Sequence, residues 1–317
     1  MQIFDHYNDI PKTARGVSIA MGNFDGVHLG HQHVIKSAAK AAQKLCVPLG
    51  VAVFNPHPRQ FFQPGSPAER LQSNEGRARF LQGLGVDFIF ALPFDRTMSL
   101  MDDETFVRDV LAGGLGVSHV SVGADFHYGR DRVGDVASLR RFGKDHGFTV
   151  DSVNLEGEGD EKFSSSAIRA ALKAGQTERA TKMLGRPWSV ESLVVRGEQR
   201  GRTIGVPTAN LSLNDYVRPR FGVYAGRARI DGQGAALPGV INVGVRPTVE
   251  GTEERLEMYL FDFAGDLYGR TLEVTLEYFL RDEQKFSGLE ALKTQIAKDI
   301  DTARTLLSQD IEVDRSA

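Results

Sequence analysis

The stretch Val17–His31, VSIAMGNFDGVHLGH, decides the architecture of the first half of the chain. It begins with a short apolar run, which is typical of a buried parallel strand. A glycine-rich turn follows and leads into an amphipathic segment. In an open α/β sheet, ligands bind outside the carboxyl end of such a strand, where the next helix presents free N–H groups. The stretch therefore predicts a strand, a ligand-binding turn and a helix, in that order.

Similar apolar runs recur downstream and alternate with amphipathic stretches. The strand-like runs are 51–54, 88–92 and 119–122, and the amphipathic stretches are 34–45 and 106–111. Strands that alternate with helices are typical of a parallel sheet with crossover helices. We therefore expect an α/β domain over residues 1–184.

After Gly185 the hydrophobic period changes from helical to alternating. Residues 255–261 and 271–278 each alternate between apolar and polar side chains, which predicts antiparallel strands with one buried face. A final amphipathic helix is expected over residues 289–307, where apolar residues recur every three or four positions. The second domain, residues 185–317, is thus predicted to be a small antiparallel sheet or barrel that ends in a helix.

Composition narrows the class of protein. With 317 residues, of which 41% are hydrophobic and 25% charged, the chain can form two packed domains. With a net charge of −3, the chain lacks the excess of basic residues that a dedicated nucleic-acid-binding protein has. No apolar run reaches the ~18–20 residues that cross a bilayer, and the first residues do not resemble a signal peptide. Cys46 is the only cysteine, which excludes an internal disulfide or a thiolate cluster. We expect a soluble cytoplasmic protein without nucleic-acid or membrane partners.

Two histidines in the glycine-rich turn are the first candidate site. His28 and His31 are three residues apart, so both can project to one side and donate hydrogen bonds to a phosphate. Spacing alone explains them equally well as two surface imidazoles on a turn. A metal site that also uses His33 is less favoured, because no carboxylate or cysteine stands nearby as a further ligand.

The decapeptide 22–31 resembles the signature of the nucleotidylyltransferase superfamily with the HxGH motif. Its fuller form is similar to that of the bacterial bifunctional riboflavin kinase/FAD synthetases. Three further segments match that family in the same order, namely 54–58 (FNPHP), 123–129 (GADFHYG) and 164–169 (SSSAIR). One departure is the tripeptide 75–77, Glu-Gly-Arg, where the family tends to have an acidic–basic pair.

The resemblance implies that the first domain is a Rossmann-like adenylyltransferase that converts FMN and ATP to FAD and pyrophosphate. Because the FMN phosphate is already an anion, alignment and charge neutralisation matter more than a base. By resemblance, the catalytic residues that hold the triphosphate are His28, His31 and Arg169. ATP or flavin binding is likewise implied for Gly22, Phe24, Asp25, Gly26, Asn55, Asp125, Ser164 and Ser165. Taken alone, the serines are more often a helix cap, and Asn55 is usually a turn residue.

A second motif lies at 201–210, GRTIGVPTAN, and resembles the riboflavin kinase motif. Further matches follow at 222–225, 242–248, 266–269 and 279–286. The resemblance implies a β-barrel kinase domain in which ATP is bound by Gly205, Pro207, Thr208 and Asn210. It also implies that Thr208 and Asn210 give oxygen ligands to the Mg²⁺ that accompanies ATP. On their own, residues 207–210 are more typical of a turn that enters a strand.

Glu257 matches the general base of the family. The 5′-hydroxyl of riboflavin is a poor nucleophile until a carboxylate accepts its proton, so the kinase step needs such a group. The alternation of residues 255–261 by itself indicates only a solvated strand face at this position.

The sequence as a whole therefore predicts a bifunctional enzyme. Riboflavin and ATP would give FMN in the second domain, and FMN and ATP would give FAD in the first, both with Mg²⁺. The partners would be small-molecule substrates, and the oligomeric state stays open between a monomer and a transient oligomer. Two alternatives remain: a nucleotidylyltransferase for another phosphorylated acceptor, and a flavin- or nucleotide-binding regulator with one or both sites inactive.

Overall fold

The computed structural model describes residues 1–67, 69–154, 157–158, 161–197, 201, 204–248 and 251–314. The chain folds into two compact units. The first consists of Met1–Pro67 and Asn74–Ser164, and the second consists of Ala68–Ser73 and Ser165–Ala317. The short segment Ala68–Ser73 thus belongs to the second unit, although the residues before and after it belong to the first.

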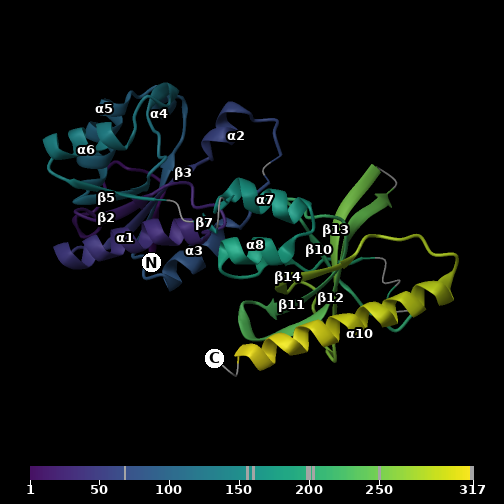
Figure 1. The fold of residues 1–317 in the computed structure, drawn as a ribbon. Helices are drawn as coiled ribbons and strands as arrows, with labels where there is room; N and C mark the ends of the chain where they lie inside the picture. Colours follow the sequence, from purple (N-terminus) through teal and green to yellow (C-terminus); the bar gives the residue numbers. More distant parts are fainter. Residues whose placement is uncertain are drawn as a thin grey trace. The chain divides into compact units, whose positions relative to one another are not determined.

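The first unit is built on a six-stranded sheet in which every pair of neighbouring strands is parallel (Figure 1). The strand order is β1-β4-β3-β2-β5-β6. The strands are β1 (Gln2–Phe4), β2 (Ser18–Met21), β3 (Leu49–Asn55), β4 (Phe88–Pro93), β5 (His119–Gly123) and β6 (Thr149–Val153). The predicted α/β architecture is confirmed. The four predicted strands form the centre of the sheet, and the two edge strands, β1 and β6, were not predicted.

Helices cover both faces of this sheet. One core cluster joins the sheet to α1 and α3, and the other joins it to the π-helix η2 and to α6. The longer helices of the unit are α1 (Leu29–Leu45), α3 (Asn74–Gly83), η2 (Phe106–Leu115) and α6 (Val136–Asp145). Shorter helices are η1 (Lys12–Ala14), α2 (Pro58–Phe62), α4 (Arg96–Ser99), α5 (Asp103–Thr105) and η3 (Arg130–Arg132), and a small hairpin is formed by β7 (Gly157–Glu158) and β8 (Glu161–Lys162).

The second unit contains a six-stranded antiparallel sheet in the order β10-β13-β12-β11-β14-β9. Its strands are β9 (Trp188–Leu193), β10 (Ala209–Ser212), β11 (Gly222–Ile230), β12 (Gln233–Thr248), β13 (Gly251–Leu260) and β14 (Thr271–Arg281). An antiparallel bridge between Val195 and Asn210 joins the two edges of the sheet. The predicted small barrel is therefore confirmed as a nearly closed one.

Three described helices complete the second unit: α7 (Ser165–Lys173), α8 (Thr177–Leu184) and α10 (Leu289–Asp314). The long α10 packs along β11, β12 and β14 (Figure 1). Its Ala303 and Leu307 are buried against Ala225 and Phe261 of the barrel. The predicted C-terminal helix is confirmed, and it continues seven residues beyond the predicted end at 307, to 314.

Helices α7 and α8 lie with the barrel, whereas the sequence analysis assigned them to the first domain. The packing explains this placement. Helix α8 packs on β9 and β14, and the Thr177 hydroxyl at its start donates a 2.8 Å hydrogen bond to the backbone carbonyl of Glu277. The functional boundary near residue 184 stays a prediction, because a contact-defined unit need not coincide with a functional domain.

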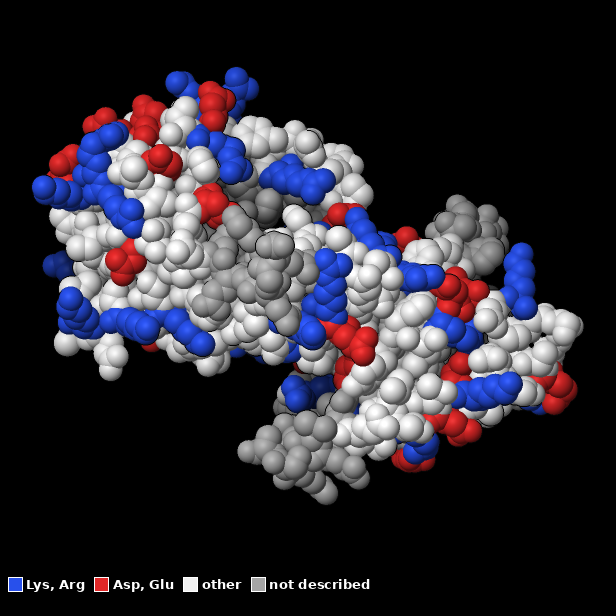
Figure 2. Space-filling model, in the orientation of Figure 1, with Lys and Arg blue, Asp and Glu red and all other residues white. Residues whose placement is uncertain are grey.

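The surface carries no single-sign field on the face drawn in Figure 2, where Lys and Arg side chains are interspersed with Asp and Glu. Within the part of the chain that the structure describes, no helix is long and apolar enough to span a membrane.

Candidate active sites

The glycine-rich turn after β2 has an unusual backbone. Phe24, Gly26 and Val27 have φ angles of 50°, 81° and 40°, in the left-handed region that favours glycine. The Phe24 and Val27 side chains are buried in the core beneath the turn. Gln32 on α1 donates a 3.1 Å hydrogen bond to the Val27 carbonyl. Burial and this bond hold the strained backbone in place, a combination found at ligand-binding sites.

The two predicted histidines are stacked at the start of α1. Their ring centroids lie 3.6 Å apart with planes inclined by 19°. His28 is the N-cap residue, and its Nδ1 accepts a 3.3 Å hydrogen bond from the backbone N–H of His31. A Cβ on Gly30 would lie only 3.2 Å from the His28 ring, so the motif needs glycine there for the ring to keep its place.

His31 is buried beside two other basic side chains. Burial, and then the positive charges of His28 and Arg77, hold the pKa of His31 well below its usual 6.5. Its Nδ1 is buried and has no hydrogen-bond partner among the residues that the structure describes. Since a buried polar atom without a partner is costly, a ligand that hydrogen-bonds this ring would stabilise it.

Three predicted segments lie at one edge of the parallel sheet. The Gly22 turn follows β2, Asn55 ends β3, and Asp125 comes two residues after β5. Because β3 and β5 both flank β2, their carboxyl ends meet at the same edge. Both the Asn55 and Asp125 side chains are exposed there.

The predicted Ser164–Arg169 element is divided between the units. The Phe163 carbonyl lies 3.6 Å from the Cβ position of Gly30, so the chain just before Ser164 runs beside the start of α1. Ser165 begins α7 in the second unit. In that unit, Arg169 Nε donates a 2.7 Å hydrogen bond to the backbone carbonyl of Glu69.

A cation that was not predicted from the sequence lies beside the histidine pair. Arg77 on α3 donates a 3.2 Å hydrogen bond from Nη1 to the carbonyl of Asn23 in the glycine-rich turn. Its charge is also one of the causes of the low His31 pKa. The tripeptide 75–77 stood out only as a departure from the family pattern, and only tertiary folding brings α3 to the turn.

An array of aromatic rings was also missed. Phe62 on α2 is 65% exposed, although it contacts Phe61 and Phe94 at centroid distances of 5.2 and 5.8 Å. Phe94 in turn contacts Phe54 at 5.5 Å. The array includes Phe54 of the predicted 54–58 segment and the adjacent pair Phe61 and Phe62, and Phe94 joins them only through tertiary folding.

In the second unit, two of the predicted kinase residues, Asn210 and Glu257, lie in a polar row that crosses three strands. In the strand register, Glu257 on β13 pairs with Asn210 on β10 and with Asn242 on β12. Directly paired residues project from the same face of a sheet, so the three side chains are neighbours. Leu256 and Met258 project from the opposite face and are buried in the barrel core.

Arg255 belongs to the same polar row, two residues before Glu257. Its Nη1 donates a 3.2 Å hydrogen bond to Asn210 Oδ1, while Asn210 Nδ2 donates one of 3.4 Å to the Thr208 carbonyl. These two bonds fix the orientation of the Asn210 amide. A Cβ on Gly197 would collide with that amide, so the backbone that follows β9 packs directly against the Asn210 side chain.

Glu283 closes the other end of the row. A Cβ on Gly244 would collide with the Glu283 carboxylate, so this side chain lies against the β12 backbone. Partial burial raises the pKa of Glu283, and its hydrogen bond with Asn242 acts in the opposite direction. Gly244 is the register partner of Arg255.

The turn that precedes β10 carries the remaining predicted ATP-binding residues. Gly205 has a φ of 84° in a turn in which Val206 N–H donates a 2.8 Å bond to the Gly201 carbonyl. Pro207 and Thr208 connect this turn to β10. The motif residues 202 and 203 lie outside the described residues.

The described part of the chain contains no group of three or more His, Cys, Asp or Glu side chains that could hold a metal ion. A magnesium ion that arrives with ATP does not require one, because it keeps water and phosphate ligands and takes few from the protein. The neutral oxygens of Thr208 and Asn210 have the hard donor character that this ion prefers.

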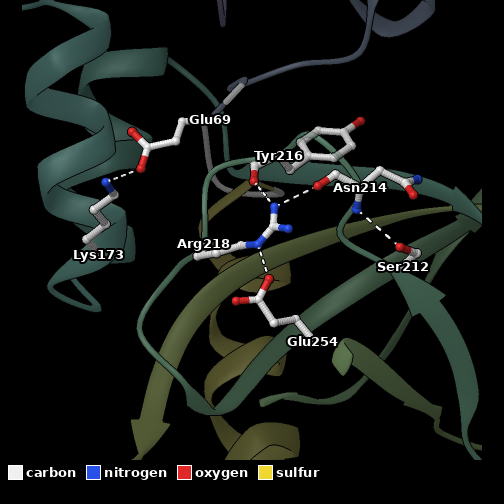
Figure 3. A network of polar contacts seen from close by, with 7 residues as sticks. All are labelled: Glu69, Lys173, Ser212, Asn214, Tyr216, Arg218 and Glu254. Atoms are coloured by element: carbon white, nitrogen blue, oxygen red, sulfur yellow. Dashed lines mark hydrogen bonds and ion pairs between the residues drawn. The ribbon is translucent and has the colours of Figure 1, made fainter. Parts of the chain in front are cut away.

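A network of polar contacts in the second unit braces the loop between β10 and β11 (Figure 3). Arg218 donates a 2.7 Å hydrogen bond to the Asn214 carbonyl and another to the Tyr216 carbonyl, and it forms an ion pair with Glu254 on β13. The Arg70 N–H donates a 2.7 Å hydrogen bond to the Asp215 carbonyl of the same loop. The segment 69–73 is thereby linked to the strand that carries Glu257.

Comparisons with known proteins agree with both halves of this picture. A family model described as FAD synthetase matches residues 10–167, and one described as riboflavin kinase matches residues 184–307. The chain is 42% identical to the bifunctional riboflavin kinase/FMN adenylyltransferase of Pseudomonas fluorescens, over 96% of this chain and 98% of that one. It is 40% identical to the protein of the same name from Escherichia coli K12, over 91% and 92% of the two chains.

A solved structure also matches over nearly the whole length. A crystal structure described as a macrolide-efflux protein from Streptococcus pneumoniae superposes with a TM-score of 0.86 at 31% identity, and the match covers 96% of this chain and 98% of that one.

Proposed function

The chain belongs to the family of bifunctional riboflavin kinase/FMN adenylyltransferases, and we propose that it has two separate active sites, one for each reaction. The first reaction converts riboflavin and ATP to FMN and ADP, and the second converts FMN and ATP to FAD and pyrophosphate. The register pairing of Glu257 with Asn210 is the observation that carries the proposal, because it brings the expected base beside an expected nucleotide ligand.

For the kinase step, Glu257 accepts the proton of the riboflavin 5′-hydroxyl as that oxygen attacks the γ-phosphorus of ATP. Asn210 and Thr208 hold the nucleotide beside it, and the flanking hydrogen bonds from Arg255 and to the Thr208 carbonyl keep the Asn210 amide in one orientation. The turn that contains Gly205 and Pro207 leads directly into Thr208 and Asn210, so its backbone lies beside the proposed nucleotide ligands. Preorganised groups of this kind lower the barrier without rearranging during the reaction.

Magnesium is part of this proposal for both steps. When bound, Mg²⁺ neutralises phosphate charge and orients the leaving group. In the second unit, Thr208 and Asn210 would hold it through oxygen atoms. These residues are few and neutral, which suits an ion that arrives on a triphosphate.

For the adenylyl step, the stacked pair His28 and His31 would bind the triphosphate of ATP at the start of α1. The unpartnered Nδ1 of His31, the N-terminus of a 17-residue helix and the nearby Arg77 all support an anion at this point. Ser164, Ser165 and Arg169 would add further donors. No strong base is required, because the attacking FMN phosphate is already ionised.

The flavin ring of FMN is proposed to bind near the aromatic array of the first unit. An isoalloxazine ring is flat and largely apolar, and aromatic side chains stack on such rings. Phe62 leaves most of its surface uncovered and lies close to the end of β3, where Asn55 is found. Asn55 and Asp125 supply polar groups at the same sheet edge.

The proposal extends to the domain boundary and the cellular setting. Residues 1–184 are proposed as the adenylyltransferase domain and 185–317 as the kinase domain. The enzyme is proposed to act in the cytoplasm on small molecules, without nucleic acid.

Chromatography of the flavins formed from riboflavin, ATP and Mg²⁺ tests the proposal. Wild-type protein should form FMN first and FAD later. Glu257→Gln should lower the rate of FMN formation by about 10²- to 10⁴-fold, the usual contribution of a general base, and leave the conversion of added FMN to FAD unchanged. His31→Ala should have the opposite pattern and stop at FMN.

Other outcomes identify the alternatives. Accumulation of FMN alone by the wild-type protein would indicate another phosphorylated acceptor for the first unit. Tight flavin binding with no turnover at either step would indicate a regulator. Equal loss of both steps in Glu257→Gln would contradict separate sites.

A further inference from the structure

The residues so far assigned to the kinase step, Thr208, Asn210 and Glu257, include no cation. A phosphoryl group in transfer carries negative charge on its three equatorial oxygens, and kinases stabilise that charge with cations. Building on the proposed kinase site, we propose that Arg255 is a further catalytic residue of riboflavin phosphorylation, and that its guanidinium contacts the γ-phosphoryl group.

The position of Arg255 in the sheet carries this proposal. Side chains two residues apart on a strand project from the same face, so Arg255 accompanies Glu257. Its Nη1 also contacts Asn210 Oδ1 at 3.2 Å, and Asn210 pairs directly with Glu257 in the register. The guanidinium therefore touches one expected nucleotide ligand and lies on the same face as the expected base.

The environment of Arg255 favours a functional cation. The residue is half-buried, and the interaction of a charge with a phosphate strengthens as water is excluded. Across β12 its register partner is Gly244, which has no side chain, and the Glu283 carboxylate lies against that glycine. Arg255 therefore has Glu257 two residues away on the same face of β13, and the Glu283 carboxylate lies against the glycine opposite it.

The step balances without any further reactant. The 5′-oxygen of riboflavin forms a bond to the γ-phosphorus, and the bond from that phosphorus to the β–γ bridging oxygen breaks. ADP leaves with the electron pair of that bond, and the hydroxyl proton passes to Glu257. Arg255 stays protonated throughout, and its planar fork of N–H donors matches the oxygens of the phosphoryl group.

A purely positioning role for Arg255 makes a different prediction. If the side chain only oriented the Asn210 amide, its loss would weaken binding of the magnesium nucleotide and leave the turnover of bound substrate unchanged. Contact with the phosphoryl group acts mainly in the transition state, so its loss lowers kcat.

The test uses the full-length variants Arg255→Gln and Arg255→Lys. FMN formation is measured at saturating riboflavin, ATP and Mg²⁺, and calorimetry gives the Kd of Mg²⁺·ADP. We expect kcat to fall about 10²- to 10³-fold in Arg255→Gln, below the range of ~10³–10⁵ known for arginines that act on a transferred phosphoryl group, because Arg255 is not fully buried. The kcat of Arg255→Lys should fall less than that of Arg255→Gln. The Kd of Mg²⁺·ADP should change by less than about threefold in both variants.

Two controls accompany these variants. Conversion of added FMN to FAD by the same samples reports that the protein is folded and should be unchanged. Arg304→Gln removes an arginine of the same unit that pairs with Asp262 on the surface, with 47% of its side chain exposed, and should retain both activities.

A kcat of Arg255→Gln within about threefold of wild type would overturn the proposal, as would an unchanged kcat with weaker Mg²⁺·ADP binding. If Arg255→Gln also loses FAD formation, Arg255→Ala assayed with added guanidinium decides. Recovery of FMN formation in proportion to guanidinium supports the proposal, and no recovery in the folded variant overturns it. The role of Glu257 is judged separately, from Glu257→Gln.

Discussion

Arg169 and Glu69 are joined by a 2.7 Å hydrogen bond from the Arg169 Nε to the Glu69 backbone carbonyl. The Glu69 side chain forms an ion pair of 2.5 Å with Lys173, one helical turn further along α7 (Figure 3). Glu69 has a φ of 42°, so its backbone is held in a conformation that non-glycine residues rarely adopt. One residue of the segment 69–73 thus anchors two cations of α7, and one of these is the arginine proposed for adenylyl transfer.

We expect a charge reversal at this pair to impair adenylyl transfer and a double reversal to restore it. Glu69→Lys and Lys173→Glu should each raise the KM for ATP in FAD formation by about two- to fivefold, because an exposed ion pair contributes up to ~1 kcal/mol. FMN formation serves as the internal control. If the KM for ATP of the double variant is as high as that of the two single variants, the ion pair of Glu69 with Lys173 does not help to position Arg169.

Gly30→Ala should separate stability from activity. Within a helix, alanine is favoured over glycine by up to ~1 kcal/mol, so the free energy of unfolding should hold or rise. The new Cβ would nevertheless lie 3.2 Å from the His28 ring and force it to move. We expect FAD formation to fall at least about tenfold, as for a displaced catalytic group, while FMN formation is unchanged.

Flavin chromatography and chemical denaturation of the same sample check both parts of the Gly30→Ala prediction. Full FAD formation in the variant would show that the position of the His28 ring does not matter for this step.

Phe62→Ala tests the aromatic array. Because Phe62 is 65% exposed, its removal should change the free energy of unfolding by less than about 0.5 kcal/mol. If the flavin ring stacks there, the KM for FMN in FAD formation should rise about three- to tenfold, as expected from the loss of an aromatic contact worth ~0.5–1.5 kcal/mol. Phe88→Leu, in the same unit but away from α2, is the control. An unchanged KM for FMN in Phe62→Ala would place the flavin elsewhere.

The sequence predicted the fold through its buried strands. Residues 51–54 are an almost fully buried apolar run, and residues 119–122 are fully buried although they include His119 and Ser121. The edge strands β1 and β6 were missed because β1 is three residues long and β6 has only two apolar residues, Val150 and Val153, and so lacks the near-continuous apolar run of the central strands. The allocation of α7 and α8 to the barrel depends on long-range packing that no local pattern encodes.

The site could be predicted only as far as its residues are close in sequence. His28 and His31 lie within one turn of α1, so their spacing implied that they meet. Arg77 reaches Asn23 of the turn by tertiary folding from a position 54 residues downstream, and Arg255 joins Asn210 through strand pairing. Such contacts follow from topology, and residue type alone does not single them out.

A pH-dependent loss of stability is expected from His119 in the first unit. Burial lowers the pKa of this ring, and the nearby Asp151 acts weakly in the opposite direction. Its Nδ1 and Nε2 lie 2.7 and 3.0 Å from the hydroxyls of Thr149 and Ser121. As the pH falls below about 6.5, the unfolded chain takes up a proton that the folded ring refuses, so the free energy of unfolding decreases.

Denaturation of the protein at pH 7.5 and 5.5 measures this effect of His119. His119→Asn keeps polar atoms but does not titrate, so its free energy of unfolding should change less between the two pH values than that of the wild type. An equal change in both proteins would assign the acid sensitivity to other groups.

The buried ion pair of the barrel provides the last prediction. Glu277 on β14 pairs with Arg227 on β11, and only 8% and 19% of their side chains are exposed. Thr275 donates a 2.7 Å hydrogen bond to the Glu277 carboxylate, and Arg227 donates one of 2.8 Å to the Leu307 carbonyl of α10.

Glu277→Gln leaves the Arg227 charge buried without its counter-ion, which should cost about 3–5 kcal/mol. The double variant Arg227→Met/Glu277→Leu removes both charges and should be more stable than Glu277→Gln, because a buried pair can be replaced by apolar side chains at little cost. Denaturation followed by circular dichroism measures the free energy of unfolding of both variants. If the double variant is less stable than Glu277→Gln, the pair stabilises the barrel through the hydrogen bond of Arg227 to α10 and not through charge balance.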